Sequence, residues 1–333
     1  MSDATSPEGG HVLAGTDVAI PSLGVGTWAW GDKGTWGMGG YDESLTESTI
    51  RQAWEASIAA GVVLFDTAEV YGGGESERII GRLLAADPGA RNQVVIASKF
   101  MPSPWKLNVR AALLAAARAS RERLGIDAID LYQIHGPISL RSHDALAEAL
   151  AAAHAEGLVR AVGVSNYSAK ETRSMDAALR KRGLRLASNQ IEFSLLRSRP
   201  LRGGLISTCR ELGVVPLAYS PIGQGRLTGK YSAANPPPRG RSFSAHPMAE
   251  VDTIVSLLRR IGMAHGDRTP SQVALAWLIA KGAVPIPGAK NAEQAQQNAG
   301  ALGWRLTGEE LDLLTQASLD GTRTLQQRIW QHG

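Results

Sequence analysis

Three side chains with complementary acid–base chemistry follow consecutive apolar runs of this chain. Asp66 ends one run, Tyr71 follows it closely, and Lys99 ends the next run. A carboxylate keeps a lysine charged, and a charged lysine lowers the pKa of a nearby phenol from its usual value of about 10. Such a tyrosine can give a proton to a carbonyl oxygen, while a neutral His135, after a third run, orients that oxygen.

Each of these residues alone has a simpler interpretation. A single Asp often caps a turn, Lys99 could form an ion pair at the edge of a sheet, and His135 could be a buried imidazole with its hydrogen bonds satisfied. Their joint occurrence at successive strand ends favours the catalytic interpretation. The elements that would bring them together must therefore be parallel strands whose carboxyl ends meet at one rim.

Short apolar strands alternate with helices along most of the chain. The predicted strands span residues 22–26, 62–66, 94–98, 129–134, 159–164, 187–190, 214–218 and 283–286. The predicted helices span residues 46–60, 75–85, 107–124, 142–155, 168–182, 201–212, 270–281 and 291–299. This alternation predicts a parallel sheet closed into a (β/α)8 TIM barrel, with an open doubly wound sheet as the alternative.

Several segments lie outside the regular alternation. Residues 11–21 predict an N-terminal hairpin, and residues 220–247 form a long loop after the seventh strand that we expect to cover an anionic ligand. Two extra helices are predicted at residues 248–264 and 308–318. We expect one domain over residues 1–333, with residues 1–10 disordered and residues 320–333 forming a C-terminal tail.

Composition excludes several classes of function. The net charge of +4 is spread without basic runs, which argues against a nucleic-acid partner. Cys209 is the only cysteine and no metal-ligand spacing is present, so we expect neither a disulfide nor a metal. No apolar window reaches the roughly 18 residues of a membrane span, and no signal region is visible, so the cytosol is the expected compartment. The oligomeric state stays open.

Two glycine-rich motifs have the wrong context for nucleotide binding. Gly24-Val-Gly26-Thr-Trp-Ala29 matches G-x-G-x-x-A, but the Trp-rich loop behind it cannot open a helix for a pyrophosphate. Gly225-Arg-Leu-Thr-Gly-Lys230 is one residue shorter than a P-loop, and Tyr231 stands where Ser or Thr is needed. Neither a Rossmann site nor a triphosphatase is therefore expected, and the absence of G-x-S-x-G argues against a serine hydrolase.

The strand-end motifs together resemble the aldo-keto reductase family. They occur in the family's order and are Asp66-Thr-Ala-Glu-Val-Tyr71-Gly, Ala97-Ser-Lys99, Tyr132-Gln-Ile-His135-Gly-Pro, Gly163-Val-Ser165-Asn166-Tyr, Asn189-Gln190, Tyr219-Ser220-Pro-Ile-Gly-Gln-Gly and Ile286-Pro-Gly-Ala-Lys290. The resemblance implies a (β/α)8 barrel that uses NADPH to reduce aldehydes or ketones. It implies that Tyr71 is the general acid, Asp66 and Lys99 tune it, and His135 orients the carbonyl.

The resemblance also implies a cofactor site. Ser165, Asn166 and Gln190 would hold the nicotinamide carboxamide, and Tyr219 would stack on its ring. Residues of two segments would hold the pyrophosphate and the adenosine 2′-phosphate: Ser220, Ile222, Gly223, Gly225, Lys230 and Arg241 in one, and Gly288, Lys290, Gln294, Gln297 and Asn298 in the other. Because Lys290 offers a cation beside a helix N-terminus, NADP is favoured over NAD.

The substrate is less well defined. The glycine-rich segments resemble the bacterial and plastid-type members that include pyridoxal reductases and potassium-channel β subunits. By the same resemblance, Trp28, Trp30 and Trp36 would either border the substrate or pack the loop. A redox-sensing regulatory subunit with slow turnover is the alternative to an enzyme. A lyase or isomerase using Lys99 as a Schiff base is a further alternative.

Overall fold

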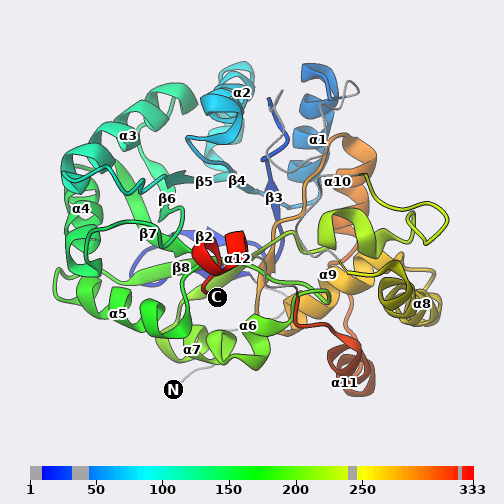
Figure 1. Ribbon diagram of the computed structural model, residues 1–333. Helices are drawn as coiled ribbons and strands as arrows, with labels where there is room; N and C mark the ends of the chain where they lie inside the picture. The colour runs from blue at the N-terminus through cyan, green and yellow to red at the C-terminus, as the bar shows by residue number, and fades with distance from the viewer. Residues whose placement is uncertain (1–9, 32–44, 239–245, 322–324) are drawn as a thin grey trace.

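The core of the computed structural model is an eight-stranded parallel barrel (Figure 1). The structure describes residues 10–31, 45–238, 246–321 and 325–333. The strands are β3 (Gly24–Gly26), β4 (Leu64–Asp66), β5 (Val95–Phe100), β6 (Ile129–Ile134), β7 (Val159–Ser165), β8 (Leu186–Glu192), β9 (Val215–Tyr219) and β10 (Val284–Pro285). They pair in chain order. A parallel bridge between Gly26 and Gly288 joins the first strand to the segment after the last, so the sheet closes and the doubly wound alternative is excluded.

Helices surround the barrel on its outer side (Figure 1). They are α1 (Glu47–Ala59), α2 (Glu75–Ala86), α3 (Val109–Leu124), α4 (His143–Ala155), α5 (Ala169–Arg180), α6 (Arg199–Arg202), α7 (Leu205–Leu212), α8 (Met248–Ala264), α9 (Pro270–Ala280), α10 (Ala292–Ala299) and α11 (Gly308–Ala317). Several begin with a side-chain cap; in α5, Ser168 and Glu171 form a capping box. The buried faces of these helices and of the strands form one large apolar cluster between the two layers.

A short hairpin closes the end of the barrel where the strands begin. It consists of β1 (His11–Val12) and β2 (Ala19–Ile20), as expected from residues 11–21. Leu13, Val18 and Ile20 are buried and pack with inward-facing strand residues such as Leu64 and Leu131. The hairpin therefore closes the barrel interior at the amino ends of the strands. The carboxyl ends of the strands, with their polar residues, lie at the opposite rim.

The structure differs from the predicted elements in two places. The helix expected over residues 201–212 is split into α6 and α7 because Gly204 adopts a left-handed conformation, with a φ of 77°. The tail contains a helix that the sequence pattern did not predict, α12 (Leu325–Trp330). The expected disorder of residues 1–10 falls, up to residue 9, outside the described residues. Within the described ranges, no helix is long and apolar enough to cross a membrane.

Candidate active site

The predicted acid–base group assembles at the carboxyl ends of β4 and β5. The ammonium of Lys99 donates to Asp66 Oδ1 at 2.5 Å, to the backbone oxygen of Thr67 at 2.8 Å and to Tyr71 Oη at 3.2 Å. Lys99 is fully buried and Asp66 is 2% exposed, so water competes little for either charge. The structure thus brings together the three residues that the sequence predicted to act together.

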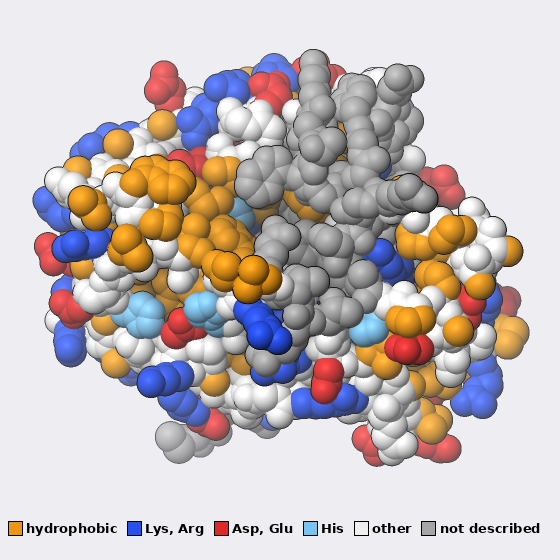
Figure 2. Space-filling model, viewed as in Figure 1, with side chains coloured by type: hydrophobic (Ala, Val, Ile, Leu, Met, Phe, Trp, Pro, Cys, Tyr) orange, Lys and Arg blue, Asp and Glu red, His pale blue; other side chains and the backbone are white. Residues whose placement is uncertain are grey.

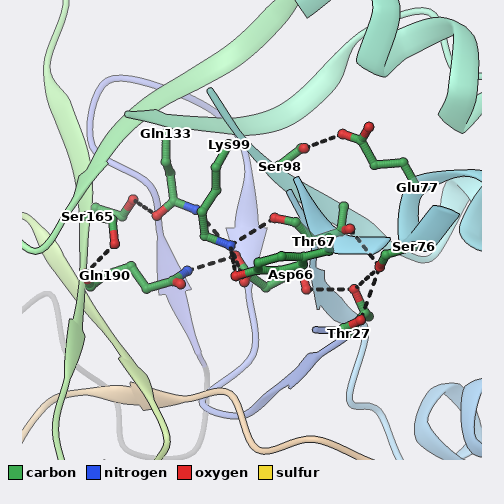
Figure 3. Close-up of polar contacts among 12 residues, drawn as sticks. Thr27, Asp66, Thr67, Ser76, Glu77, Ser98, Lys99, Gln133, Ser165 and Gln190 are labelled. Carbon is green, nitrogen blue, oxygen red and sulfur yellow. Dashed lines mark hydrogen bonds and ion pairs between the residues drawn. The ribbon is translucent and has the colours of Figure 1, made fainter. Parts of the chain in front are cut away.

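Asp66 is held by two further donors from across the barrel (Figure 3). Its second carboxylate oxygen, Oδ2, accepts from Gln190 Nε2 at 2.7 Å and from Gln133 Nε2 at 3.3 Å. Gln133 in turn accepts from Ser188 through Oε1 at 3.2 Å. Because a buried carboxylate is stable only when its lone pairs are used, this network fixes Asp66 and, through it, Lys99.

Burial determines the protonation state of Tyr71. It raises the pKa of the phenol above its ordinary value of 10, and the charge of Lys99 offsets this only in part. The sequence prediction that Lys99 would lower this pKa is therefore wrong in its net direction. Burial also lowers the pKa of Lys99, but Asp66 and Tyr71 outweigh it, so the net shift is upward. At neutral pH, Tyr71 keeps its proton and Lys99 its charge.

His135 lies directly after β6 and faces Tyr71. Their ring centroids are 5.7 Å apart in an edge-to-face arrangement. Burial, and next the charge of Lys99, lower the pKa of His135 well below 6.5, so the imidazole is neutral near pH 7. A neutral imidazole and a protonated phenol can each donate a hydrogen bond to one carbonyl oxygen, so the orienting role of His135 stays a prediction.

A second layer of hydroxyls supports these residues from behind. Ser76, at the start of α2, is hydrogen-bonded to the hydroxyls of Thr27 and Thr67, both at 2.8 Å (Figure 3). Gly72 and Gly73 adopt positive φ values of 56° and 64°, which let the chain turn sharply between Tyr71 and α2. The turn and the hydroxyls together fix the backbone that presents the phenol.

The residues expected to hold a carboxamide meet at the ends of β7, β8 and β9. Ser165 Oγ donates to the backbone oxygen of Gln190 at 2.9 Å, and Asn166 Nδ2 donates to Ser165 Oγ at 3.1 Å. Tyr219 Oη donates to Asn166 Oδ1 at 2.9 Å. Hydroxyl and amide groups beside an aromatic ring fit a flat, neutral carboxamide, so this donor set agrees with a nicotinamide.

The expected phosphate-side residues lie in the turn after β9. This turn is a 3₁₀ segment, Gly223–Thr228, preceded by half-buried Ser220 and Ile222. Ser220 has a φ of 48° and Gly225 a φ of 88°, and a side chain at Gly225 would come within 3.3 Å of Lys230. Lys230 is exposed. A glycine turn beside a lysine lets a charged ligand approach the backbone closely, which fits a pyrophosphate.

The expected adenosine-side residues lie at the N-terminus of α10. Asn291 caps this helix, and the backbone N–H of Lys290 donates to Gln294 Oε1 at 3.1 Å. Asn298 Nδ2 donates to the backbone oxygen of Gly288 at 3.2 Å, and Gln297 is exposed on the same helix. A lysine at a helix N-terminus fits a phosphate group.

The three tryptophans expected near the substrate do not share one environment. Trp28 is half-buried in the loop after β3. Trp30 is fully buried: its indole N–H donates to the backbone oxygen of Ala289 at 2.9 Å and its ring packs on Phe65. Its role is therefore corrected from a substrate contact to core packing. Trp36 and Arg241 lie outside the described residues.

Sequence reasoning missed two contributors to the site. Gln133 is a polar residue near the end of β6, and its position two residues before His135 was the available signal for its contact with Asp66. Trp330 lies on α12, and its ring is 5.7 Å from that of His135. No local pattern in the tail indicated this contact, because it depends on how a distant segment folds back over the barrel. Among the described residues, no cluster of His, Cys, Asp or Glu could hold a metal ion.

Comparisons with known proteins identify relatives of this chain. The profile of the Aldo/keto reductase family matches residues 22–318. Pyridoxal reductase of Arabidopsis thaliana chloroplasts is 38% identical over 327 residues, covering 94% of this chain and 87% of that protein.

Solved structures show the same barrel. A glycerol dehydrogenase from Gluconobacter oxydans aligns with a TM-score of 0.78 and 27% identity, covering 96% of this chain and 99% of its own. An aldo-keto reductase from Klebsiella pneumoniae, crystallised with NADPH, aligns with a TM-score of 0.69 and 28% identity, covering 92% of this chain and 94% of its own.

Proposed function

The chain belongs to the aldo/keto reductase family, and from this premise we propose that it reduces an aldehyde or ketone to the alcohol with NADPH, Tyr71 giving the proton. The observation that carries the proposal is the buried contact of Lys99 with both Asp66 and Tyr71, with neutral His135 facing the same phenol. This arrangement supplies a proton and an oriented carbonyl at one point.

The chain's own residues have separate roles in this reaction. Bound NADPH supplies the hydride that adds to the carbonyl carbon. Tyr71 donates its proton to the carbonyl oxygen, and His135 holds that oxygen by a second hydrogen bond. Lys99 stabilises the negative charge that develops on Tyr71, and Asp66 acts on Lys99 without touching the substrate.

The proposed cofactor contacts extend from β7 to α10. Ser165, Asn166 and Gln190 hold the carboxamide, and Tyr219 supports the nicotinamide ring. Residues of the turn after β9 hold the pyrophosphate, and Lys290 at the N-terminus of α10 selects the 2′-phosphate of NADPH. The crystal structure of the Klebsiella pneumoniae relative with NADPH supports this choice of cofactor.

The surface around the barrel opening favours an apolar carbonyl compound. Exposed apolar side chains on this face come from the loops after β5 and β6 and from α12 (Figure 2). They are Trp105, Leu107, Leu140, Leu325 and Ile329, all at least 59% exposed. Because such side chains attract flat or apolar molecules, and because a relative is a pyridoxal reductase, aromatic aldehydes including pyridoxal are the proposed substrates.

The contacts of Lys99 disfavour the Schiff-base alternative. A lysine must lose its proton to attack a carbonyl, and Asp66 and Tyr71 together raise the pKa of Lys99. Borohydride should therefore trap no substrate adduct on Lys99. No described feature specifically favours a regulatory subunit.

The test is NADPH oxidation measured across aromatic aldehydes, aliphatic aldehydes, ketones and pyridoxal, beside the Tyr71→Phe variant. We expect ordinary enzymatic turnover with at least one aldehyde and a loss of about 10²–10⁴-fold in the variant, because the proton donor is removed. NADPH affinity should be unchanged, since the phenol acts on the substrate. Tight NADPH binding without turnover on the whole panel would favour the regulatory alternative, and variant activity within tenfold of wild type would refute the role of Tyr71.

A further inference from the structure

The C-terminal segment lies over the proposed nicotinamide pocket. Figure 1 shows α12, in red, in front of the barrel opening. Trp330, its last residue, packs edge-on against His135, and a side chain on Gly136 would come within 3.2 Å of the Trp330 ring. Trp330 therefore approaches this part of the rim closely, where a larger residue at 136 would have to displace its ring by a few tenths of an ångström.

The residue after this helix, Gln331, is buried among polar groups of the rim. It is 6% exposed, and its Nε2 donates to Glu192 Oε2 at 2.6 Å and to Tyr219 Oη at 2.8 Å. Glu192 ends β8 and is 2% exposed, and Arg197, also buried, lies with its Nε 3.6 Å from the same carboxylate oxygen. A buried carboxylate on a buried arginine is a rigid anchor for an amide.

Hydrogen bonds continue from Gln331 into the carboxamide-binding group. Tyr219 Oη accepts from Gln331 and donates to Asn166 Oδ1, and Asn166 Nδ2 donates to Ser165 Oγ. The backbone N–H of His332 also donates to the backbone oxygen of Asn166 at 3.0 Å, where Asn166 has a φ of 64°. Two successive residues of the tail therefore hold Tyr219 and Asn166 from one side.

The polarity of this chain of bonds is fixed. Burial, and next the charge of Glu192, raise the pKa of Tyr219 well above 10, so its phenol keeps the proton that it donates to Asn166. Gln331 must then donate to both Glu192 and Tyr219, which leaves its Oε1 buried with no hydrogen-bond partner among the described residues. A buried acceptor without a donor is costly, so the two hydrogen bonds that Gln331 donates must outweigh this cost to hold its amide in place.

We propose that Gln331, anchored on Glu192, is a positioning residue of the nicotinamide pocket: it fixes the ring of Tyr219 and, through Asn166, the contacts of the carboxamide. This inference rests on the proposed use of NADPH and assigns a specific role to the tail. Gln331 does not touch the reacting atoms of the substrate. Its effect is confined to the nicotinamide half of the cofactor, because its partners all lie at the ends of β7, β8 and β9.

The test compares two ligands by titration calorimetry. NADP⁺ contains the nicotinamide, whereas 2′-phospho-ADP-ribose contains only the adenosine and pyrophosphate parts. We expect Gln331→Leu, which removes the hydrogen bonds but keeps a side chain of comparable volume, to weaken NADP⁺ binding about tenfold, the size of one lost hydrogen bond to a buried group. Binding of 2′-phospho-ADP-ribose should stay within twofold of wild type, which also shows that the variant is folded.

Matched variants separate a positioning role from a general effect of the tail. Arg328→Gln changes an exposed residue of α12 and should leave both affinities unchanged. Tyr219→Phe removes the hydroxyl through which Gln331 acts, so the double variant Gln331→Leu/Tyr219→Phe should lose no more NADP⁺ affinity than the larger single loss.

Three results would overturn the proposal. The first is that Gln331→Leu binds NADP⁺ within threefold of wild type. The second is that Gln331→Leu loses as much affinity for 2′-phospho-ADP-ribose as for NADP⁺. The third is that the losses of NADP⁺ affinity in Gln331→Leu and Tyr219→Phe add up fully in the double variant. These results refute only the role of Gln331, because the wild type still binds NADP⁺ in each case. A wild type that binds no NADP⁺ refutes the proposed function itself and the inference with it.

Discussion

Replacing Asp66 with Asn isolates the charge of the buried pair while keeping its shape. Lys99 is fully buried. The shortest hydrogen bond that its Nζ donates is to Asp66 Oδ1, at 2.5 Å. In the variant, one carboxylate oxygen becomes an NH₂ group that must face a donor, either Lys99 Nζ or Gln190 Nε2. Removing one partner of a buried ion pair costs about 3–5 kcal/mol, so we expect the free energy of unfolding at pH 7 to fall by about that amount.

The pH dependence gives the sharper expectation. In the wild type, the raised pKa of Lys99 contributes stability that is fully present below the ordinary lysine pKa and is lost only as pH rises through the raised value. Between pH 7 and 9.5 its contribution is therefore constant. In Asp66→Asn, burial acts on Lys99 without the opposing carboxylate, so we expect its pKa to fall below that of the unfolded chain. The unfolded chain then binds more protons, and the variant gains up to about 1.4 kcal/mol of stability per pH unit as pH rises.

Urea unfolding of both proteins at several pH values between 7 and 9.5 measures this difference. A matched control is Asp130→Asn, which removes an equally buried carboxylate, 1% exposed, from Arg91 and Arg160. Arginine does not lose its proton in proteins. The difference in free energy of unfolding between wild type and Asp130→Asn should therefore not change with pH. Two results would show that Lys99 does not depend on Asp66 for its charge. One is a free energy of unfolding that changes with pH equally in wild type and Asp66→Asn, and the other is a loss of less than about 1 kcal/mol in the variant at pH 7.

Two further predictions concern the cofactor and the imidazole. Lys290→Ala should weaken NADPH binding about tenfold or more and leave NADH binding within twofold, because only NADPH carries the 2′-phosphate; equal losses would refute this role of Lys290. Burial lowers the pKa of His135 well below 6.5. We therefore expect kcat for carbonyl reduction, measured at saturating substrate, to show no decline from His135 protonation between pH 8 and 6. A decline near pH 6.5 that disappears in His135→Asn would contradict a neutral imidazole.

The barrel and the buried acid–base group at its rim could be predicted because local signals coincide with them. Apolar runs end at Asp66 and Lys99, and polar residues at the ends of parallel strands must share one rim. The break at Gly204 was missed because a glycine within an apolar pattern is compatible with either a continuous or an interrupted helix.

Contacts that depend on tertiary packing could not be predicted in the same way. Trp30 occurs in a loop composition that suits a substrate opening, yet its indole is buried against Ala289, far away in the sequence. Gln331 lies in a tail without periodicity, and its role depends on meeting Glu192 and Tyr219 from two different strands. Sequence spacing carries information about neighbours along one element, whereas these contacts join segments over 100 residues apart.

In the proposed reaction, the protonation of Tyr71 at neutral pH suits proton donation to a carbonyl oxygen. Burial raises the pKa of this phenol, and Lys99 limits the rise. A protonated phenol can give its proton to a carbonyl oxygen directly, whereas oxidation of an alcohol needs the phenolate as a base. In the proposed reduction, we expect Lys99 to stabilise the charge that appears on Tyr71 only as the proton leaves, which would lower the barrier without requiring a phenolate beforehand. We therefore expect alcohol oxidation by the same residues to become faster as pH rises, because the fraction of ionised phenol increases.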